Sequence, residues 1–459
     1  MNLHRLLLER AAAGKPLRVG LIGAGKFGAM YLAQAKHTPG IHIVGIAELS
    51  PQRARSSLAR TGWAQNRYEA RSFDAALTNG STCITEDALA LIAAPQVEIV
   101  IDATGNPAAG IRHVLAACAH GTHIVMVNVE ADALAGPLLA RRARDAGIVY
   151  SLAYGDQPAL ICEMVDWCRA AGFEVVAAGK GTKYLPEYHA STPETVWPYY
   201  GFSPEMVAAG DFNAQMFNSF LDGTKSAIEM AAVANATRLA PAPGGLAFPP
   251  CGVDDLPGVL RPRSEGGHLH HAGQVEVISS MERDGRPVFR DLRWGVYVTF
   301  RAGDAHGEDY VHRCFTEYGF STDGSGRYAA MYKPYHAIGL ELGISVASVG
   351  LRNESTGQPV SWSGDVVATA KRRLAAGEAL DGEGGYTVYG KLMPAAASLR
   401  CGGLPLGLAH GVKLKREVAA GATVRWDDVA FDADDEAVRF RREMEVVFAD
   451  VADQTVAAN

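Results

Sequence analysis

The sequence lacks the features of a membrane or secreted protein. No apolar run reaches the roughly eighteen residues that a membrane-spanning helix requires. Residues 1–15 have neither the apolar core nor the small-residue cleavage site of a secretion signal. The seven cysteines are odd in number and show no paired spacing, which argues against a disulfide framework and indicates a reducing compartment. We therefore expect a cytoplasmic protein with free thiols and no membrane partner.

The chain also lacks a strong charge of either sign. A net charge of −7 over 459 residues gives no electrostatic reason to expect nucleic acid or an anionic membrane as a partner. Hydrophobic residues make up 48% of the chain and charged residues 20%, as in ordinary soluble globular proteins. The chain is too long for one hydrophobic core, and its length indicates two or three domains. We expect three, at residues 1–153, 154–349 and 350–459.

What the sequence does contain is a glycine-rich loop directly after an apolar strand. The loop consists of Gly23, Ala24, Gly25, Lys26, Phe27 and Gly28. In the G-x-G-x-x-G pattern, Gly23 permits the tight turn, Gly25 lets the backbone approach a pyrophosphate, and Gly28 lets the next helix pack closely. The first turn of that helix offers N–H groups to the phosphates. The loop therefore predicts a bound dinucleotide.

An acidic residue lies where such a fold places the ribose. Glu48 ends the apolar run 41–47 and follows Gly28 by twenty residues. A carboxylate there binds the free ribose hydroxyls of NAD, whereas Arg53 and Arg55 could meet the 2′-phosphate of NADP. The sequence thus predicts NAD or NADP and leaves the choice open.

Strand-like and helix-like segments alternate from residue 17 to residue 153. The expected strands are 17–22, 41–47, 97–103, 122–127 and 148–153, with helices at 51–60, 85–93, 108–119 and 133–145. Short β-branched runs separated by helices predict an α/β fold with a Rossmann-type parallel sheet. Ligands of such sheets lie at the carboxyl ends of the strands. Thr104, Gly105, Asn106 and Asn128 follow two strand ends and are candidate cofactor contacts.

The middle of the chain shows a different order of helices and strands. We expect a helix at 159–170, a strand at 173–178, a long helix around 218–235, and strands at 274–279 and 294–300. This pattern predicts an α+β substrate domain with an antiparallel sheet. Such a sheet could also form a dimer interface, so we expect a homodimer.

The last hundred residues contain an internal repeat. The segment 371–377, KRRLAAG, recurs at 415–421 as KREVAAG, and Leu380 matches Val424 at the same offset. Two copies predict a small pseudo-symmetric β module, because a solenoid needs about three repeats or more.

Two groups of cationic side chains could contact a substrate. Lys180 and Lys183 follow a buried type of strand, where neighbouring lysines suit a phosphate or carboxylate through charge-assisted hydrogen bonds. A solvated loop explains the same residues. Lys333 and His336 are a second candidate group, although a cluster that caps a helix would look the same. A small anionic substrate is the expected partner.

Asp222 and Lys225 open an apolar helical segment. Residues three apart share a helix face. A carboxylate beside an ammonium in a dry cleft can transfer a proton next to a hydride acceptor. A surface ion pair at a helix start is the other reading.

A metal site is less clearly indicated, and its ligands are unknown. The candidates are His268, His270 and His271 in a glycine-rich loop, and Asp254 and Asp255 as oxygen ligands for a hard cation. Neither set has a standard ligand spacing.

The order of three motifs resembles the homoserine dehydrogenase superfamily. These are Gly155-Asp156-Gln157-Pro158, then the segment 178–182, then Lys225-Ser226-Ala227-Ile228-Glu229-Met230-Ala231. The resemblance covers about residues 17–235. It implies that Lys225 is the general acid or electrostatic partner of the reacting carbonyl, with Asp222 as its carboxylate neighbour.

From Asp365 onward the chain resembles an SAF (antifreeze-like, β-clip) domain. A body and tail of this kind are similar to the 1-deoxy-D-xylulose-5-phosphate reductoisomerase-like group, notably around 154–160, 217–231 and 382–392. That resemblance implies reductive isomerisation of 1-deoxy-D-xylulose 5-phosphate to 2-C-methyl-D-erythritol 4-phosphate for isoprenoid synthesis, with a divalent cation such as Mg or Mn. The alternatives are a metal-independent dehydrogenase of another small polyol, sugar acid or amino-acid-like alcohol, and a nucleotide-sensing protein without hydride transfer.

Overall fold

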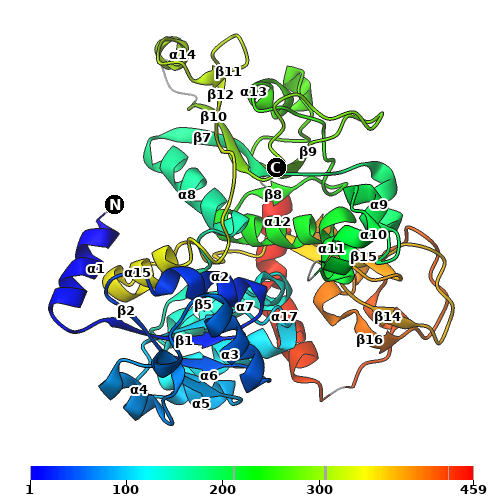
Figure 1. The fold of residues 1–459 in the computed structure, drawn as a ribbon. Helices are drawn as coiled ribbons and strands as arrows, with labels where there is room; N and C mark the ends of the chain where they lie inside the picture. Colours follow the sequence, from blue (N-terminus) through cyan, green and yellow to red (C-terminus); the bar gives the residue numbers. More distant parts are fainter. Residues whose placement is uncertain (1, 210–211, 304–307, 433, 458–459) are drawn as a thin grey trace. The chain divides into compact units, whose positions relative to one another are not determined.

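The computed structural model describes residues 2–209, 212–303, 308–432 and 434–457. The chain forms two compact units (Figure 1). Unit 1 comprises Met1–Leu160 and His336–Val360, and unit 2 comprises Ile161–Tyr335 and Ser361–Asn459. These limits do not coincide with the expected boundaries after 153 and 349, and the division into three domains stays a prediction.

Unit 1 is built on a six-stranded parallel sheet in the order β3-β2-β1-β4-β5-β6. The strands are β1 (Leu17–Ile22), β2 (Ile41–Ala47), β3 (Cys83–Thr85), β4 (Ile99–Asp102), β5 (His123–Met126) and β6 (Tyr150–Leu152). The expected Rossmann-type sheet is confirmed. The strand order reverses between β1 and β4, which is where such sheets bind their ligands. The short edge strand β3 was not expected from the sequence. It includes Thr85, and the helix expected at 85–93 begins only at Ala88.

Helices cover both faces of this sheet (Figure 1). They are α1 (Leu3–Ala12), α2 (Lys26–Ala35), α3 (Pro51–Arg60), α4 (Phe73–Asn79), α5 (Ala88–Ala93), α6 (Pro107–His120), α7 (Val129–Asp145) and α15 (Gly343–Arg352). Burial on both faces explains why the central strands are nearly all apolar. Val346 and Val349 of α15 join the same core as Val19 and Ile101 of the sheet, so α15 is an integral part of unit 1.

Asp132 of α7 is a buried carboxyl group beneath this sheet. It is fully buried and accepts a hydrogen bond from the Tyr150 hydroxyl at 2.8 Å. Burial raises the pKa of Asp132 from 3.8 to about 7, against the effect of the Tyr150 hydrogen bond. The folded state therefore keeps a proton that the unfolded chain loses as the pH rises from 3.8 to about 7. Between these two pH values the contribution of this group to the free energy of unfolding falls by on the order of 4 kcal/mol.

Asp132→Asn should accordingly flatten the dependence of stability on pH. We expect the melting temperature of the variant, relative to wild type, to be higher at pH 8 than at pH 5, measured by differential scanning fluorimetry at both values. Asp145→Asn, at an exposed position of the same helix, is the matched control and should leave the profile unchanged. A constant difference between Asp132→Asn and wild type at the two pH values would contradict the argument.

Unit 2 contains a six-stranded mixed sheet in the order β11-β12-β10-β7-β9-β8. The strands are β7 (Phe173–Thr182), β8 (Ala240–Pro241), β9 (Gln274–Ser279), β10 (Val296–Ala302), β11 (Ser321–Thr322) and β12 (Tyr328–Lys333). The expected antiparallel pairing is present where β10 pairs with β7 and β12. Strand β9 instead pairs in parallel with β7 and β8, so the sheet is mixed. Parallel neighbours need a long crossover, and the helical segment between β7 and β9 supplies it.

The remaining helices belong to this part of the chain. They are α8 (Gln157–Ala170), which crosses the boundary between the units, and α9 (Val196–Tyr200), α10 (Pro204–Ala209), α11 (Ala214–Leu221), α12 (Thr224–Thr237), α13 (Leu256–Val259), α14 (Glu308–Glu317), α16 (Ala395–Cys401) and α17 (Glu436–Ala457). Among the helices of the described ranges, none combines the length and apolarity of a membrane span.

Strand β7 is longer than the sequence predicts and includes Lys180. The expected strand ends at residue 178, before Lys180, and this limit is wrong. A glycine on each side of Lys180, Gly179 and Gly181, allows the strand to continue. A Cβ at Gly179 would lie 1.7 Å from the Glu276 carbonyl oxygen, and one at Gly181 would lie 1.9 Å from that of Leu292. Only glycine fits at such contacts, so Lys180 is fixed within the sheet.

The long helix expected around 218–235 is two helices, α11 and α12. They are separated by Asp222 and Gly223. Gly223 has a φ of +88°, in the left-handed region that glycine adopts without strain. The chain therefore changes direction there, and Lys225 falls in the first turn of a new helix.

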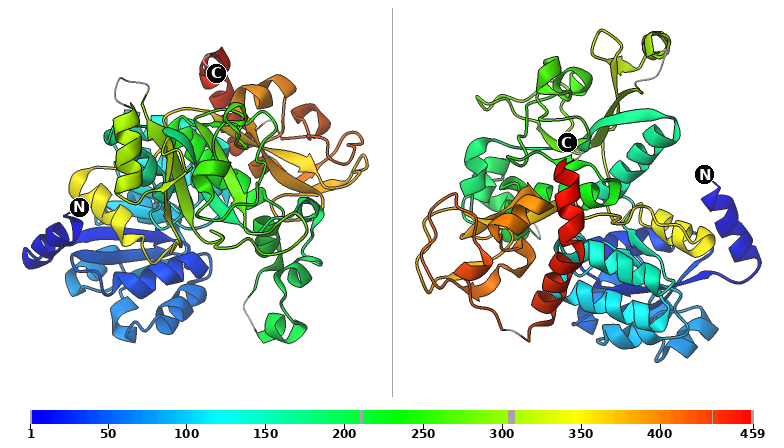
Figure 2. Two further views of the ribbon diagram at one scale, coloured as in Figure 1. Left: turned by 90° about the horizontal axis from the view of Figure 1, so that it is seen from above. Right: turned by 180° about the vertical axis from the view of Figure 1, so that it is seen from behind.

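The C-terminal part of unit 2 reflects the internal repeat. Strand β13 (Gly364–Ala370) pairs with β15 (Val388–Pro394), and β14 (Ala379–Asp381) pairs with β16 (His410–Lys413). Leu374 and Val418 occupy equivalent positions of the two copies and exchange backbone hydrogen bonds of 2.9 and 3.0 Å. This reciprocal pairing is what a pseudo-symmetric β module requires. Helix α17 runs beside α16 of this module (Figure 2).

Candidate functional site

The glycine loop of unit 1 has the geometry of a phosphate cradle. Gly23 has a φ of +91°, and a Cβ there would lie 2.8 Å from the Ala103 carbonyl oxygen. A Cβ at Gly28 would lie 2.3 Å from the Gly23 carbonyl oxygen, whereas the space at Gly25 is open. Gly25 is the N-cap of α2, which begins at Lys26. Open space before the first-turn N–H groups fits a pyrophosphate.

Glu48 supports this loop from the end of β2. Only 7% of the residue is exposed, and its Oε2 accepts the Ala24 N–H at 2.9 Å. Its Oε1 lies 3.4 Å from Arg53 Nη1. A carboxylate has about four acceptor positions, so these contacts leave room for a ribose hydroxyl. Arg55 is exposed.

The expected contacts at the ends of β4 and β5 form one hydrogen-bonded group. Asp102 Oδ1 accepts the Thr104 N–H at 2.9 Å. The fully buried Asn128 donates to the Asn106 carbonyl oxygen at 2.8 Å and lies 3.1 Å from Thr104 Oγ1. Thr104, Gly105 and Asn106 are exposed. The exposed segment is thus available to a ligand, and Asn128 shapes it from beneath.

In unit 2, Lys180 and Glu229 form a buried ion pair between β7 and α12. The two residues are 6% and 4% exposed. Because the carboxylate of Glu229 neutralises Lys180, this lysine is poorly suited to hold a substrate anion. Glu229 lies within the helix motif 225–231, which gives no separate signal for it.

Lys225 lies one turn before Glu229 on the same face of α12. Residues four apart on a helix are neighbours. All residues of α12 after Lys225 are buried except Ala236, whereas Lys225 itself is half-buried. Lys225 is in the first turn of α12, where the positive end of the helix dipole favours negative charge nearby. Lys225 is thus well placed to meet developing negative charge on a substrate.

Asp222 has a different partner from the one expected. The sequence predicts an Asp222–Lys225 pair, either for proton transfer or as a surface ion pair. Instead, Asp222 Oδ2 lies 2.7 Å from Lys371 Nζ, and both side chains are buried. Asp222 Oδ1 accepts the Thr224 N–H at 2.9 Å. Burial raises the pKa of Asp222, while Lys371 opposes this shift. Asp222 therefore holds the junction before α12, and Lys371 is a site residue that the sequence analysis missed.

His189 also contacts the turn before α12. Its Nδ1 lies 2.7 Å from the Asp222 carbonyl oxygen, and the Tyr184 hydroxyl lies 3.0 Å from its Nε2. The ring stacks on Tyr389, with centroids 4.5 Å apart. Burial lowers the pKa of His189. The neutral ring with a proton on Nδ1 matches these contacts.

Lys183 lies beside an arginine that was also not anticipated. Lys183 Nζ donates to the Tyr199 carbonyl oxygen, and it lies 6.0 Å from the centre of the Tyr200 ring. The Arg293 guanidinium lies 5.7 Å from the same ring and 4.7 Å from that of Trp294. Burial and the charge of Arg293 lower the pKa of Lys183. Within the described ranges, neither cation forms an ion pair with a carboxylate.

The second candidate group of the sequence is divided between the units. Lys333 ends β12 in unit 2, with its Nζ 5.8 Å from the centre of the Tyr335 ring. His336 is the first residue of the second segment of unit 1. Helix α15 begins only at Gly343, so neither residue caps it.

The metal candidates are not brought together. Asp254 pairs with Arg290 at 3.1 Å, and His271 Nδ1 lies 2.9 Å from the Ala272 carbonyl oxygen. Over the part of the chain that the structure describes, no three His, Cys, Asp or Glu side chains gather to hold a metal ion.

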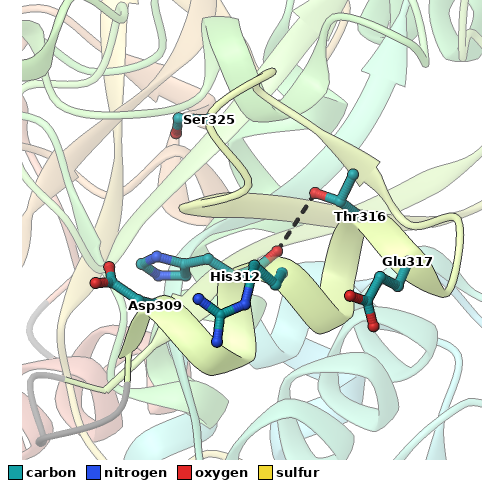
Figure 3. Close-up of a pocket in the computed structure, with 6 residues that line it drawn as sticks. Asp309, His312, Thr316, Glu317 and Ser325 are labelled. Carbon is teal, nitrogen blue, oxygen red and sulfur yellow. Dashed lines mark hydrogen bonds between the residues drawn. The ribbon is translucent and has the colours of Figure 1, made fainter.

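A polar surface pocket of about 450 Å³ opens beside α14 (Figure 3). It is lined by Asp309, His312, Arg313, Thr316, Glu317 and Ser325. None of the candidate residues lines it, and it has no part in the function proposed below.

Two family models match the chain. Residues 17–127 match "Oxidoreductase family, NAD-binding Rossmann fold", and residues 155–342 match "Oxidoreductase DRL, catalytic domain". Neither model names homoserine dehydrogenase or an SAF domain, so both resemblances stay predictions. No curated protein matches.

Several solved structures match over part of the chain. A myo-inositol dehydrogenase from Lactobacillus casei, in complex with NAD(H) and myo-inositol, is 18% identical (TM-score 0.27), with 38% of this chain and 50% of that chain covered. A 3-ketoreductase from Actinomadura kijaniata, with TDP-benzene and NADP, is 16% identical (TM-score 0.26), with 37% and 49% covered. An NAD-binding oxidoreductase from Klebsiella pneumoniae is 19% identical (TM-score 0.27), with 38% and 47% covered. The chain thus spans about half the length of these proteins.

Proposed function

We propose that this NAD(P)-dependent oxidoreductase reduces the carbonyl group of a small anionic hydroxy-aldehyde or hydroxy-ketone, and oxidises the alcohol in reverse. The oxidoreductase class follows from the NAD-binding Rossmann domain at residues 17–127 and the oxidoreductase catalytic domain at residues 155–342. The anionic substrate is inferred from unit 2. The observation that carries this inference is the pair of cations Lys183 and Arg293, which have no carboxylate partner in the described ranges.

Arg293 has the arrangement of an anion-binding arginine. Its guanidinium lies against the rings of Trp294 and Tyr200, and such stacking leaves the N–H groups at its edge available. These N–H groups match the oxygens of a phosphate or carboxylate. Lys183, against the same Tyr200 ring, adds a second positive charge. We assign the anionic end of the substrate to these two residues, in place of Lys180, which is paired with Glu229.

Lys225 is assigned the reacting end of the substrate. The bound nicotinamide supplies or accepts the hydride. As the hydride reaches the carbonyl carbon, negative charge develops on the oxygen, and the ammonium of Lys225 stabilises it and gives up a proton. A positioned proton donor of this kind contributes roughly 10²–10⁴-fold to a rate. The positive end of the α12 dipole acts in the same direction.

For the cofactor we propose NAD rather than NADP. The buried carboxylate of Glu48 lies at the strand end where the ribose binds in this type of fold. A 2′-phosphate beside that carboxylate would be repelled. Arg53 is already within 3.4 Å of Glu48.

The test is a reduction assay that follows the absorbance of NADH or NADPH. Three- to six-carbon hydroxy-aldehydes and hydroxy-ketones would be supplied as phosphate esters, as acids and as neutral compounds. We expect oxidation of NADH with anionic compounds and little with neutral ones. Arg293→Gln should raise KM for the anionic substrate at least about tenfold. The control is Arg286→Gln, since Arg286 lies on the same connection between strands and pairs with the exposed Asp284. Equal KM values for both variants would refute the assignment of Arg293.

One arm of this assay is 1-deoxy-D-xylulose 5-phosphate, the substrate implied by the sequence resemblance. It is a phosphorylated hydroxy-ketone and so falls within the proposed class. Turnover with it that collapses on adding EDTA would favour the reductoisomerase, whereas metal-independent reduction of other substrates favours a simple dehydrogenase. The cytoplasmic location and the homodimer stay predictions.

A further inference from the structure

The turn before α12 is held by contacts from four segments of unit 2. Asp222 donates its backbone N–H to the Asn218 carbonyl oxygen at 2.8 Å, and its own carbonyl oxygen is 2.7 Å from His189 Nδ1. Its carboxylate accepts from Thr224 and lies against Lys371. The first turn of α12, which contains Lys225, therefore has little freedom to move.

Lys371 is the contact from the C-terminal module. Its ammonium group lies 2.7 Å from Asp222 Oδ2 and donates to the carbonyl oxygens of Ser191 and Gly385, each at 2.7 Å. The ammonium group is thus surrounded by one carboxylate oxygen and two backbone carbonyl oxygens. The side chain is 2% exposed. Burying an ion pair costs about as much free energy as the attraction returns, so net stability alone does not explain this contact.

A second contact from the same module holds the helix itself. The N–H of Gly390 in β15 donates to Thr224 Oγ1 at 2.8 Å. A Cβ at Gly390 would lie 2.7 Å from Leu406 Cδ2 and 3.2 Å from Thr224 Cγ2. The close approach of β15 to the start of α12 therefore depends on this glycine.

The internal repeat supplies a comparison. Lys415 occupies the position of Lys371 in the second copy, yet Lys415 is exposed. The burial and pairing of Lys371 are thus not needed to build the repeat. They are particular to the copy that touches the start of α12.

We propose that Lys371 is a positioning residue, which fixes the first turn of α12 and thereby aims the ammonium group of Lys225 at the substrate. The C-terminal module thus takes part in the reaction without touching the substrate. This inference rests on the proposed function, in which Lys225 is the proton donor. Misplacing a reacting group by about 1 Å can cost a hundredfold in rate.

The experiment compares Lys371→Met, the control Lys415→Met, and the double variant Asp222→Asn/Lys371→Met in the full-length protein. We expect Lys371→Met to lower kcat about tenfold to a hundredfold, with KM and NADH affinity changed less than about threefold, and Lys415→Met to match wild type. The double variant removes both buried charges and keeps an oxygen for the Thr224 N–H. Its melting temperature should return toward that of wild type while kcat stays low.

Hydrogen–deuterium exchange gives a reading that does not depend on turnover. Lys371→Met and the double variant should both exchange faster than wild type at the first turn of α12, and Lys415→Met should not. Recovery of kcat together with stability in the double variant, or unchanged exchange at α12, would overturn the proposal. If exchange rises as expected but wild type reduces no carbonyl compound, the proposed function fails and the mechanical role of Lys371 survives.

Discussion

Replacing Lys225 by methionine should lower kcat at least about a hundredfold and leave the affinity for NADH unchanged. Methionine keeps most of the length and apolar volume of lysine but can neither donate a proton nor carry charge. The loss should fall on the transition state, where the carbonyl oxygen becomes negative, and less on substrate binding. The glycine loop offers the pyrophosphate the backbone N–H groups at the start of α2, so binding of the dinucleotide should not depend on this side chain.

The measurement combines steady-state kinetics with a fluorescence titration of NADH. Lys225→Arg is the informative control, since arginine keeps the positive charge but does not give up a proton at ordinary pH. We expect this variant to lie between wild type and Lys225→Met in kcat. A Lys225→Met protein with normal kcat would remove Lys225 from the mechanism. Loss of NADH binding would instead indicate a defect in folding.

The second large effect concerns the anchoring of the C-terminal helix. Arg441 of α17 is 1% exposed and binds Asp365 of β13 through two contacts of 3.0 and 2.7 Å. It also contacts Glu445 at 3.0 Å and lies 4.9 Å from the Trp362 ring. Arg441→Met leaves the carboxylate of Asp365 buried without its cation. Breaking a buried pair in this way costs roughly 3–5 kcal/mol, so we expect a loss of that size in the free energy of unfolding.

Chemical denaturation of unit 2, followed by tryptophan fluorescence, measures this loss. In the double variant Asp365→Asn/Arg441→Met most of the stability should return, since no buried charge is left unpaired. Arg439→Met, at an exposed position of the same helix, should change stability by less than about 0.5 kcal/mol. If Arg441→Met were no more destabilising than Arg439→Met, α17 would not be anchored by this pair.

The parts of the fold that the sequence predicts well are those with local signals. Strand β1 and its glycine loop, strand β2 and helix α3 have the expected limits, because strand periodicity and the demands on glycine act over a few neighbouring residues. The extension of β7 through Lys180 depends on how closely the carbonyl groups of Glu276 and Leu292 approach two glycines. Those partners lie far away in the sequence, so no local pattern could reveal them.

The candidate site shows the same division. Lys225 and Asp222 were found from a motif, but their pairing was misjudged because spacing along a helix cannot account for a break at Gly223. The true partner of Asp222, Lys371, lies in the C-terminal module. Lys183 was identified as a cation after a strand, whereas Arg293 comes from a later connection and had no motif. The one available clue was the aromatic Trp294 beside it.

In the proposed reaction, a hydride moves directly between the nicotinamide and an anionic carbonyl compound. The most direct measurement uses NADH with deuterium on the transferred position of C4, incubated with the anionic substrate and wild-type protein, followed by mass spectrometry of the product. We expect one deuterium on the former carbonyl carbon of the product and none released to water, with no labelled product from Lys225→Met in the same time. Product without deuterium, or deuterium lost to solvent, would contradict direct transfer of the hydride.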